Sequence, residues 1–227
     1  MLDSFRQRQP GASLWRIVWW YFLHFLCFIW FFCCYRFRSW GKHGIPRTGP
    51  VLLISNHQSF LDPIIIGLAA HHRQFYALAR ATLFDNSLIA WLIRSLNAIP
   101  VAQGEGDLQA MRVSIDLLKH GHGLLIFPEG SRTVDGATGV FQPGTMLLIK
   151  RSGATVLPVA IEGSFSVWPI FNTLPRPFGR IGVLYGHPIE AEQLIRMGPD
   201  AAMTHLRQTV EELRLRLDQK MKRSSAL

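Results

Sequence analysis

After residue 50 the chain alternates short apolar runs with stretches of helical periodicity, and this alternation limits the folds it can adopt. Apolar runs bounded by Gly, Pro and polar residues predict strands, whereas apolar positions three and four residues apart predict amphipathic helices. The predicted strands cover residues 51–55, 75–79, 98–102, 124–127, 156–161 and 181–185, and the predicted helices cover 63–71, 86–96, 108–120, 144–151 and 202–221. We therefore expect an α/β fold with a largely parallel sheet that helices cover on both faces.

One long apolar segment precedes this region. Between residues 17 and 35 only His24 is polar, which gives nineteen residues, nearly enough helix to cross a hydrocarbon core of about 30 Å. Thirteen of the 26 aromatic residues lie between Trp15 and Trp40, and Trp and Tyr favour the headgroup region of a membrane. The segment lacks the small residues of a signal-peptide cleavage site, so it predicts a retained, membrane-embedded helical anchor.

The charge distribution favours a membrane surface over nucleic acid as the partner. The net charge is +9, and residues 1–47 hold seven basic residues and one acidic residue, beside the apolar segment. No zinc-finger or RNA-recognition pattern occurs, so we expect no nucleic-acid partner. Because basic residues lie on both sides of the apolar run, a single span and a re-entrant anchor both remain open, and we favour the re-entrant form.

Breaker residues divide the anchor from the α/β region. Glycine and proline recur between residues 41 and 50, so we expect an anchor and basic linker at 1–47 and one folded domain at 48–227. The three cysteines, Cys27, Cys33 and Cys34, all lie inside the anchor and cannot build a disulfide framework. This usage agrees with a location on the cytoplasmic face of a membrane.

His57 and Asp62 lie in a polar stretch between a predicted strand and a predicted helix. Side chains on one helix face meet at a spacing of three or four, so these two, five residues apart, can meet only across a bend. Asp62-Pro63 is a good helix start, which supplies that bend. An aspartate on one imidazole nitrogen leaves the other free to take a proton, as general-base catalysis requires. The alternative is a surface histidine beside a helix-capping aspartate.

The segment Phe127-Pro128-Glu129-Gly130-Ser131-Arg132-Thr133 follows a predicted buried strand. Its proline and glycine predict a sharp turn that presents backbone amides and the Arg132 side chain. A guanidinium at such a turn suits a phosphate, because its fork can bind two oxygens at once. The alternative is a strand-ending turn with an ordinary salt bridge between Glu129 and Arg132.

Residues 56–62 and 127–132 resemble two signatures of the glycerolipid acyltransferases, in the family's order and at a similar separation. The resemblance covers residues 52–161 and includes the run 156–161. It implies a membrane-associated O-acyltransferase that moves a fatty acyl group from a thioester of coenzyme A or acyl carrier protein to 1-acyl-glycerol-3-phosphate, giving phosphatidic acid. His57 and Asp62 would be catalytic, and the substrate-binding residues would be Asn56, Ser59, Glu129, Gly130, Ser131 and Arg132. No metal and no cofactor are implied.

The chain departs from the family pattern at Gln103, where relatives often have an arginine that holds the acceptor phosphate. An amide cannot replace a guanidinium there. Either Arg80, Arg112 or Arg132 takes that role, or the acceptor is another lysolipid, such as a lysophospholipid with a different head group or a lyso-aminolipid. A catalytically silent lipid-binding membrane protein is the other alternative. The resemblance also implies membrane lipids as partners and a catalytic domain on the cytoplasmic face, at the inner membrane in a bacterium.

Overall fold

In the computed structural model, which describes residues 14–70, 73–101 and 106–224, the centre of the molecule is a seven-stranded sheet. The strand order is β1-β7-β6-β2-β5-β3-β4, and every neighbouring pair is parallel except β6 and β7. The strands are β1 (Arg38–Trp40), β2 (Val51–Ser55), β3 (Phe75–Arg80), β4 (Ala98–Val101), β5 (Gly123–Ile126), β6 (Thr155–Glu162) and β7 (Gly182–Tyr185). The predicted, largely parallel sheet is confirmed.

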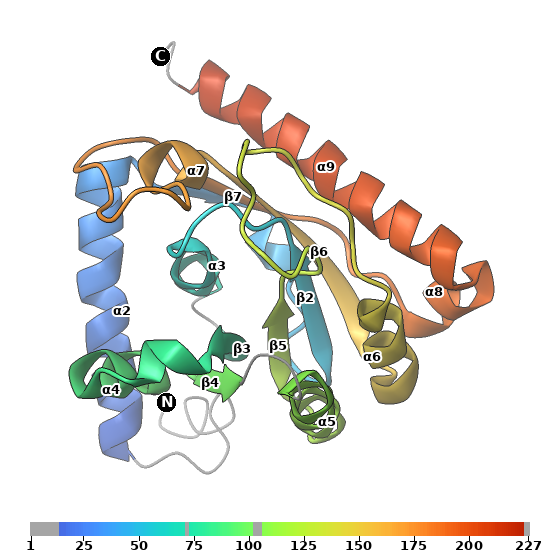
Figure 1. Ribbon diagram of the computed structural model, residues 1–227. Helices are drawn as coiled ribbons and strands as arrows, with labels where there is room; N and C mark the ends of the chain where they lie inside the picture. The colour runs from blue at the N-terminus through green and yellow to red at the C-terminus, as the bar shows by residue number, and fades with distance from the viewer. Residues whose placement is uncertain (1–13, 71–72, 102–105, 225–227) are drawn as a thin grey trace.

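Helices cover both faces of the sheet, as predicted (Figure 1). One side carries α2 (Leu14–Tyr35), α3 (Asp62–Ala69), α4 (Ser87–Ser95) and α7 (Ser164–Val167), with the 3₁₀ turns η1 (Lys42–Gly44) and η2 (Ala81–Phe84) nearby. The other side carries α5 (Gly106–Lys119), α6 (Gly144–Ser152), α8 (Ala191–Met197) and α9 (Pro199–Arg223).

The alternation of side chains along the strands builds a core on each face. In β2, Val51 and Leu53 join the core that contains α2 and α3, whereas Leu52 and Ile54 join the core that contains α5, α6, α8 and α9. All five β2 residues are buried, as expected for a central parallel strand whose two faces are both covered. The loop that follows β2 is therefore held on a rigid element.

Two features of the N-terminal region were not predicted. The strand β1 pairs in parallel with β7, although Arg-Ser-Trp carries no apolar run that would indicate a strand. The core side chains Phe31, Tyr35, Phe37 and Ile45 also come from this region. The sheet and the core of the folded domain, which was predicted to begin at residue 48, therefore also include residues that precede this boundary. Within the described ranges, α2 is the one helix long and apolar enough to cross a membrane by length and composition.

Candidate active site

The loop between β2 and α3 brings His57 and Asp62 together. His57 Nδ1 lies 2.8 Å from Asp62 Oδ2, so the predicted contact across the bend is present. Asp62 is the first residue of α3 and Pro63 is the second. Leu61 occupies the N-cap position, so Asp62 lies one position further into the helix than a capping residue. The helix N-terminus therefore adds a favourable electrostatic interaction with this carboxylate. The arrangement leaves His57 Nε2 as the imidazole nitrogen that can accept a proton.

The Asp62 carboxylate is fully buried and accepts hydrogen bonds at both oxygens. Oδ2 accepts from the backbone N–H groups of Gln58, at 2.6 Å, and Ser59, at 2.8 Å, as well as contacting His57. Oδ1 accepts from the Ser164 hydroxyl at 2.7 Å. Ser164 begins α7, more than a hundred residues away in the sequence, and sequence reasoning missed it because no local pattern links the two segments.

The turn after β5 fixes the backbone of His57. The Glu129 carboxylate accepts from the His57 N–H and from the Gly139 N–H, each at 2.9 Å, and the Thr133 N–H donates to the His57 carbonyl at 2.8 Å. Burial raises the pKa of Glu129 above its ordinary value, although the two N–H donors act in the opposite direction. Glu129 was expected at the substrate, and here its side chain holds the loop that carries the histidine.

The imidazole of His57 stacks on Phe127, with ring centroids 3.9 Å apart and planes 12° apart. This contact and the Asp62 hydrogen bond restrict both the position and the rotation of the ring. Phe127 belongs to the segment singled out in the sequence, but its contact with His57 follows only from the pairing of β2 with β5.

Asn56 and Ser59, also expected at the substrate, lie inside the protein. The Asn56 amide donates to the Ile161 carbonyl and accepts from the Ile161 N–H, each at 2.9 Å. The Ser59 hydroxyl accepts from the Leu61 N–H at 3.3 Å. Both side chains are buried and bond to backbone, so in this structure they shape the loop and do not face the cavity described next.

A mostly apolar cavity of about 520 Å³ opens beside His57. Its walls come from α2, α3, α4, β3 and the turn after β5, and its apolar lining includes Trp20, Phe60, Leu68, Phe75, Leu83 and Ile93. Gly130, Ser131 and Arg132, which the sequence analysis expects at the substrate, also line it. Gly130 has a φ of +75°, a left-handed conformation that glycine adopts without strain. An apolar ligand in this cavity would reach the imidazole.

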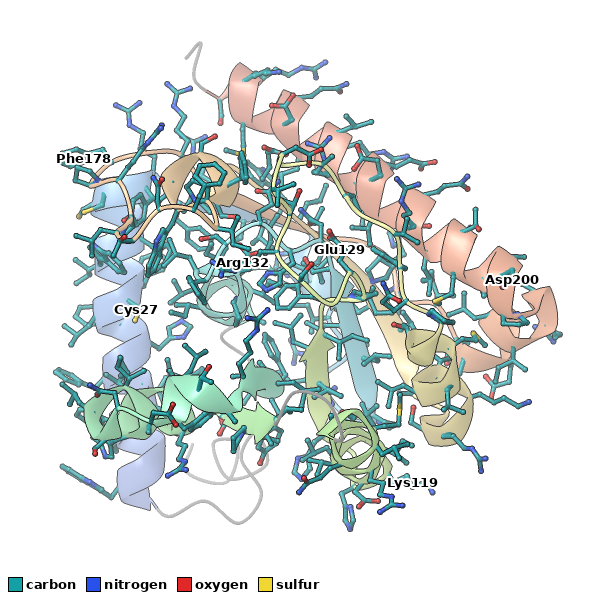
Figure 2. All side chains as sticks on the ribbon, in the orientation of Figure 1. Cys27, Lys119, Glu129, Arg132, Phe178 and Asp200 are labelled. Carbon is teal, nitrogen blue, oxygen red and sulfur yellow. The ribbon has the colours of Figure 1, made fainter. Side chains whose placement is uncertain are left out.

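Arg132 offers an unpaired cation at this cavity. Its guanidinium lies over the Phe60 ring, 3.4 Å from the centroid, and Nη1 is buried without a hydrogen-bond partner among the described residues. Burial, with the nearby Arg80, lowers the pKa of Arg132. The alternative salt bridge with Glu129 is not formed, because that carboxylate bonds to backbone N–H groups. In Figure 2 Arg132 and Glu129 lie near the centre of the molecule, with Arg132 toward α2 and α3.

The other two arginines considered for the acceptor phosphate lie in different places. Arg80 ends β3 and lines the same cavity as Arg132, whereas Arg112 lies exposed on α5 and is absent from the lining. Gln103, the departure from the family pattern, lies outside the described residues, as does the loop that follows β4. Within the described ranges, no group of three or more His, Cys, Asp or Glu side chains is arranged to hold a metal ion.

Comparison with known proteins identifies the family. The model of the family described as Acyltransferase matches residues 36–162, more than half of the chain. The chain belongs to this acyltransferase family. The matched region contains the strands β1 to β6 and both segments that meet at His57.

Named relatives agree with this assignment. The chain is 26% identical over 179 residues to the chloroplastic 1-acyl-sn-glycerol-3-phosphate acyltransferase LPAT1 of Arabidopsis thaliana, covering 76% of this chain and 50% of the relative. It is 29% identical over 165 residues to a lyso-ornithine lipid O-acyltransferase of Pseudomonas aeruginosa, covering 70% and 60%. The chain thus spans about half the length of the first of these acyltransferases.

A solved structure shares the fold. The crystal structure of the 1-acyl-sn-glycerophosphate acyltransferase PlsC from Thermotoga maritima aligns with a TM-score of 0.73 at 24% sequence identity. The alignment covers 92% of this chain and 86% of that one. The acyltransferase fold therefore extends beyond the region that the family model matches.

Proposed function

We propose that this acyltransferase moves a fatty acyl group from an acyl thioester to the free hydroxyl of 1-acyl-glycerol-3-phosphate, giving phosphatidic acid for phospholipid synthesis. The observation that carries the proposal is the combination at one cavity of a histidine paired with a buried aspartate, an apolar lining and an unpaired arginine. The names of the relatives agree with an acceptor of this class. We propose coenzyme A or acyl carrier protein as the carrier of the acyl group.

His57 is the proposed general base. Its Nδ1–H donates to Asp62, and Nε2 takes the proton of the acceptor hydroxyl as that oxygen attacks the thioester carbonyl carbon. A C–O bond forms, the tetrahedral intermediate collapses, and the C–S bond breaks. The thiolate then leaves with the proton that His57 carried. The Asp62 carboxylate stabilises the imidazolium in between, and no covalent acyl-enzyme is required.

The cavity is the proposed site for an acyl chain. Its volume lies in the range of pockets that bind small ligands, which are also mostly apolar with few polar groups. His57 and Arg132 both face it, so a lipid with its chain in the cavity would have its polar end between a base and a cation. Ser131 and Gly130 would contact the same polar end.

The phosphate of the acceptor would bind Arg132, with Arg80 as a second cation. Arg132→Ala should lower kcat/KM for 1-acyl-glycerol-3-phosphate by roughly tenfold or more, because a charge-assisted hydrogen bond contributes about 1.5 to 3 kcal/mol. Arg132→Lys should lower it as well, since lysine lacks the fork. The loss should shrink with a neutral monoacylglycerol as acceptor.

Arg112→Ala is the matched control for this measurement, because Arg112 is exposed on α5 away from the cavity. Its kcat/KM should stay near that of the unaltered protein for both acceptors. Equal losses for charged and neutral acceptors in Arg132→Ala would mean that Arg132 serves the structure and not the phosphate.

A different lysolipid is the second candidate acceptor. Gln103 removes the arginine that the family pattern would place near the phosphate, and one relative bears the name of a lyso-ornithine lipid acyltransferase. The deciding experiment incubates the purified protein with labelled acyl-CoA or acyl-carrier protein and a panel of acceptors: 1-acyl-glycerol-3-phosphate, other lysophospholipids and lyso-ornithine lipid. Preference for the lyso-ornithine lipid would replace the first proposal. Absence of product with every acceptor would favour a silent lipid-binding protein.

A further inference from the structure

The outer face of α4 is unusually apolar for a solvent-exposed helix. Leu88 and Trp91 are 73% and 54% exposed, and Ile89 and Leu92 are exposed as well. Leu88, Trp91 and Leu92 have the spacing of one helix stripe. The inner side chain Ile93 lines the cavity instead. A helix of nine residues that presents apolar side chains outward needs a nonpolar partner.

A second exposed apolar segment lies between α7 and β7. Phe171, Leu174 and Phe178 are each at least 70% exposed within residues 168–180. The segment is tied to the C-terminal end of α2, because the Gly179 N–H donates to the Cys34 carbonyl at 3.1 Å. Figure 2 shows Phe178 at the outer edge of the molecule, on the α2 side.

The long helix α2 connects these two patches. Its exposed face carries Val18, Phe22, Phe25, Leu26, Ile29 and Phe32. Trp91 of α4 contacts Trp19 with ring centroids 5.2 Å apart, so α4 lies against the N-terminal half of α2, where the two cross in Figure 1. The segment 168–180 lies at the other end. Exposed apolar side chains therefore continue along α2, from the point where α4 crosses it to the segment 168–180 at its C-terminal end.

The opposite face of α2 excludes a bilayer-spanning orientation. Trp20, Leu23, Phe31 and Tyr35 are buried against the folded domain along about 22 Å of helix. A spanning α2 would carry the packed domain, with its charged surface, into the hydrocarbon, which is strongly unfavourable. An α2 that lies in the plane of the membrane keeps the domain in water and points its exposed face to the lipid.

The charge of these segments fits an anionic lipid surface. The three segments of this surface, residues 14–35, 87–95 and 168–180, contain four basic residues and no acidic residue. Basic residues beside an apolar surface add electrostatic attraction to anionic headgroups. We propose that the outer faces of α4 and of residues 168–180 form, together with α2, one docking surface for an anionic bilayer, with α2 lying in the membrane plane.

Point substitutions test the two added patches without removing α2, whose deletion would also remove core residues. The double variants are Leu88→Asp with Trp91→Asp in α4, and Phe171→Asp with Phe178→Asp in the loop. Partitioning is measured by flotation with vesicles of equal parts phosphatidylglycerol and phosphatidylethanolamine. We expect each double variant to lose roughly tenfold or more in partitioning, because apolar contact area is replaced by charges of the same sign as the lipid.

The matched control is Leu215→Asp in α9, on the opposite face of the sheet, where Leu215 is 49% exposed. Its partitioning should stay within about twofold of the unaltered protein, as expected for an exposed site away from the membrane. Thermal unfolding of each variant shows whether the fold is kept. Folded α4 and loop variants that partition like the control overturn the proposal.

A second measurement uses the natural tryptophans. Lipids brominated near the headgroup end of the acyl chain quench indoles that enter the interface, so Trp91→Phe should reduce the quenched fraction of the fluorescence. Trp40→Phe is the control, because Trp40 packs against the cluster that holds Leu213 and Leu217 of α9. Equal quenching in unaltered protein and Trp91→Phe contradicts the proposal.

Sedimentation provides a further outcome that would contradict the proposal. If an α4 variant turns a dimer into a monomer and keeps its partitioning to vesicles, α4 binds a second copy of the chain and not the membrane. Neither readout depends on turnover, so this proposal can fail while the acyltransferase proposal stands.

Discussion

Replacing His57 by alanine should reduce acyl transfer by about 10²- to 10⁴-fold while leaving the fold intact, because a positioned general base contributes this much. The side chain lies in a loop, partly exposed, and contacts Phe127 and Asp62 without filling a core. Asp62 keeps its other hydrogen bonds from Gln58, Ser59 and Ser164 in the variant. The rate is measured with labelled acyl-CoA and 1-acyl-glycerol-3-phosphate, and the fold by thermal unfolding.

The control for this variant is His187→Ala, since His187 is exposed and lies outside the cavity. Its rate should equal that of the unaltered protein. A folded His57→Ala variant that keeps half of its activity would mean that another group, or water, removes the proton of the acceptor.

The sheet was predictable because its strands are encoded locally. β2, β5 and β6 are apolar runs bounded by breakers, and their predicted limits agree with the structure to within one or two residues. β1 was missed because its identity as a strand depends on pairing with β7, more than 140 residues later. The helices α7 and α8 were missed for a different reason, their length: four and seven residues carry too little periodicity to be recognised as helices.

The contact between His57 and Asp62 was predictable because the spacing and the helix start together require a bend. Ser164 was not, because its contact with Asp62 depends on how β6 leads into α7 beside β2. The positions of Asn56 and Ser59 could not be derived either, because the same polar residue types serve at ligands and inside tight loops. Their burial is decided by tertiary packing.

The exposed face of α4 illustrates a different limit. The sequence predicted a helix there, and the structure has it from Ser87 to Ser95. Its apolar content alone is what a core helix would show. Only the fold reveals that Ala90 and Ile93 face inward while Leu88 and Trp91 face outward, which turns an ordinary helix into a candidate membrane contact.

Asp62→Asn should reduce acyl transfer by about 10²-fold or more with little loss of stability, because the negative charge that stabilises the imidazolium is removed while the shape is kept. The amide oxygen can still accept from the N–H groups of Gln58 and Ser59 and from His57 Nδ1–H. The amide nitrogen then faces the Ser164 hydroxyl, which can turn to accept.

Asp62→Ala provides the contrast that separates the charge of Asp62 from its structural role. It leaves the buried N–H groups of Gln58 and Ser59 without their acceptor, at a cost of about 1 to 3 kcal/mol for an unsatisfied group, whereas the Ser164 hydroxyl can still donate to the Gln58 side-chain oxygen. We therefore expect a lower unfolding temperature and a lost rate in Asp62→Ala, but a lost rate alone in Asp62→Asn. Asp116→Asn, at an exposed position on α5, should change neither quantity. Unaltered turnover in Asp62→Asn would show that the carboxylate only holds the loop and the start of α3, and His57 would then need no charged partner to act as the base.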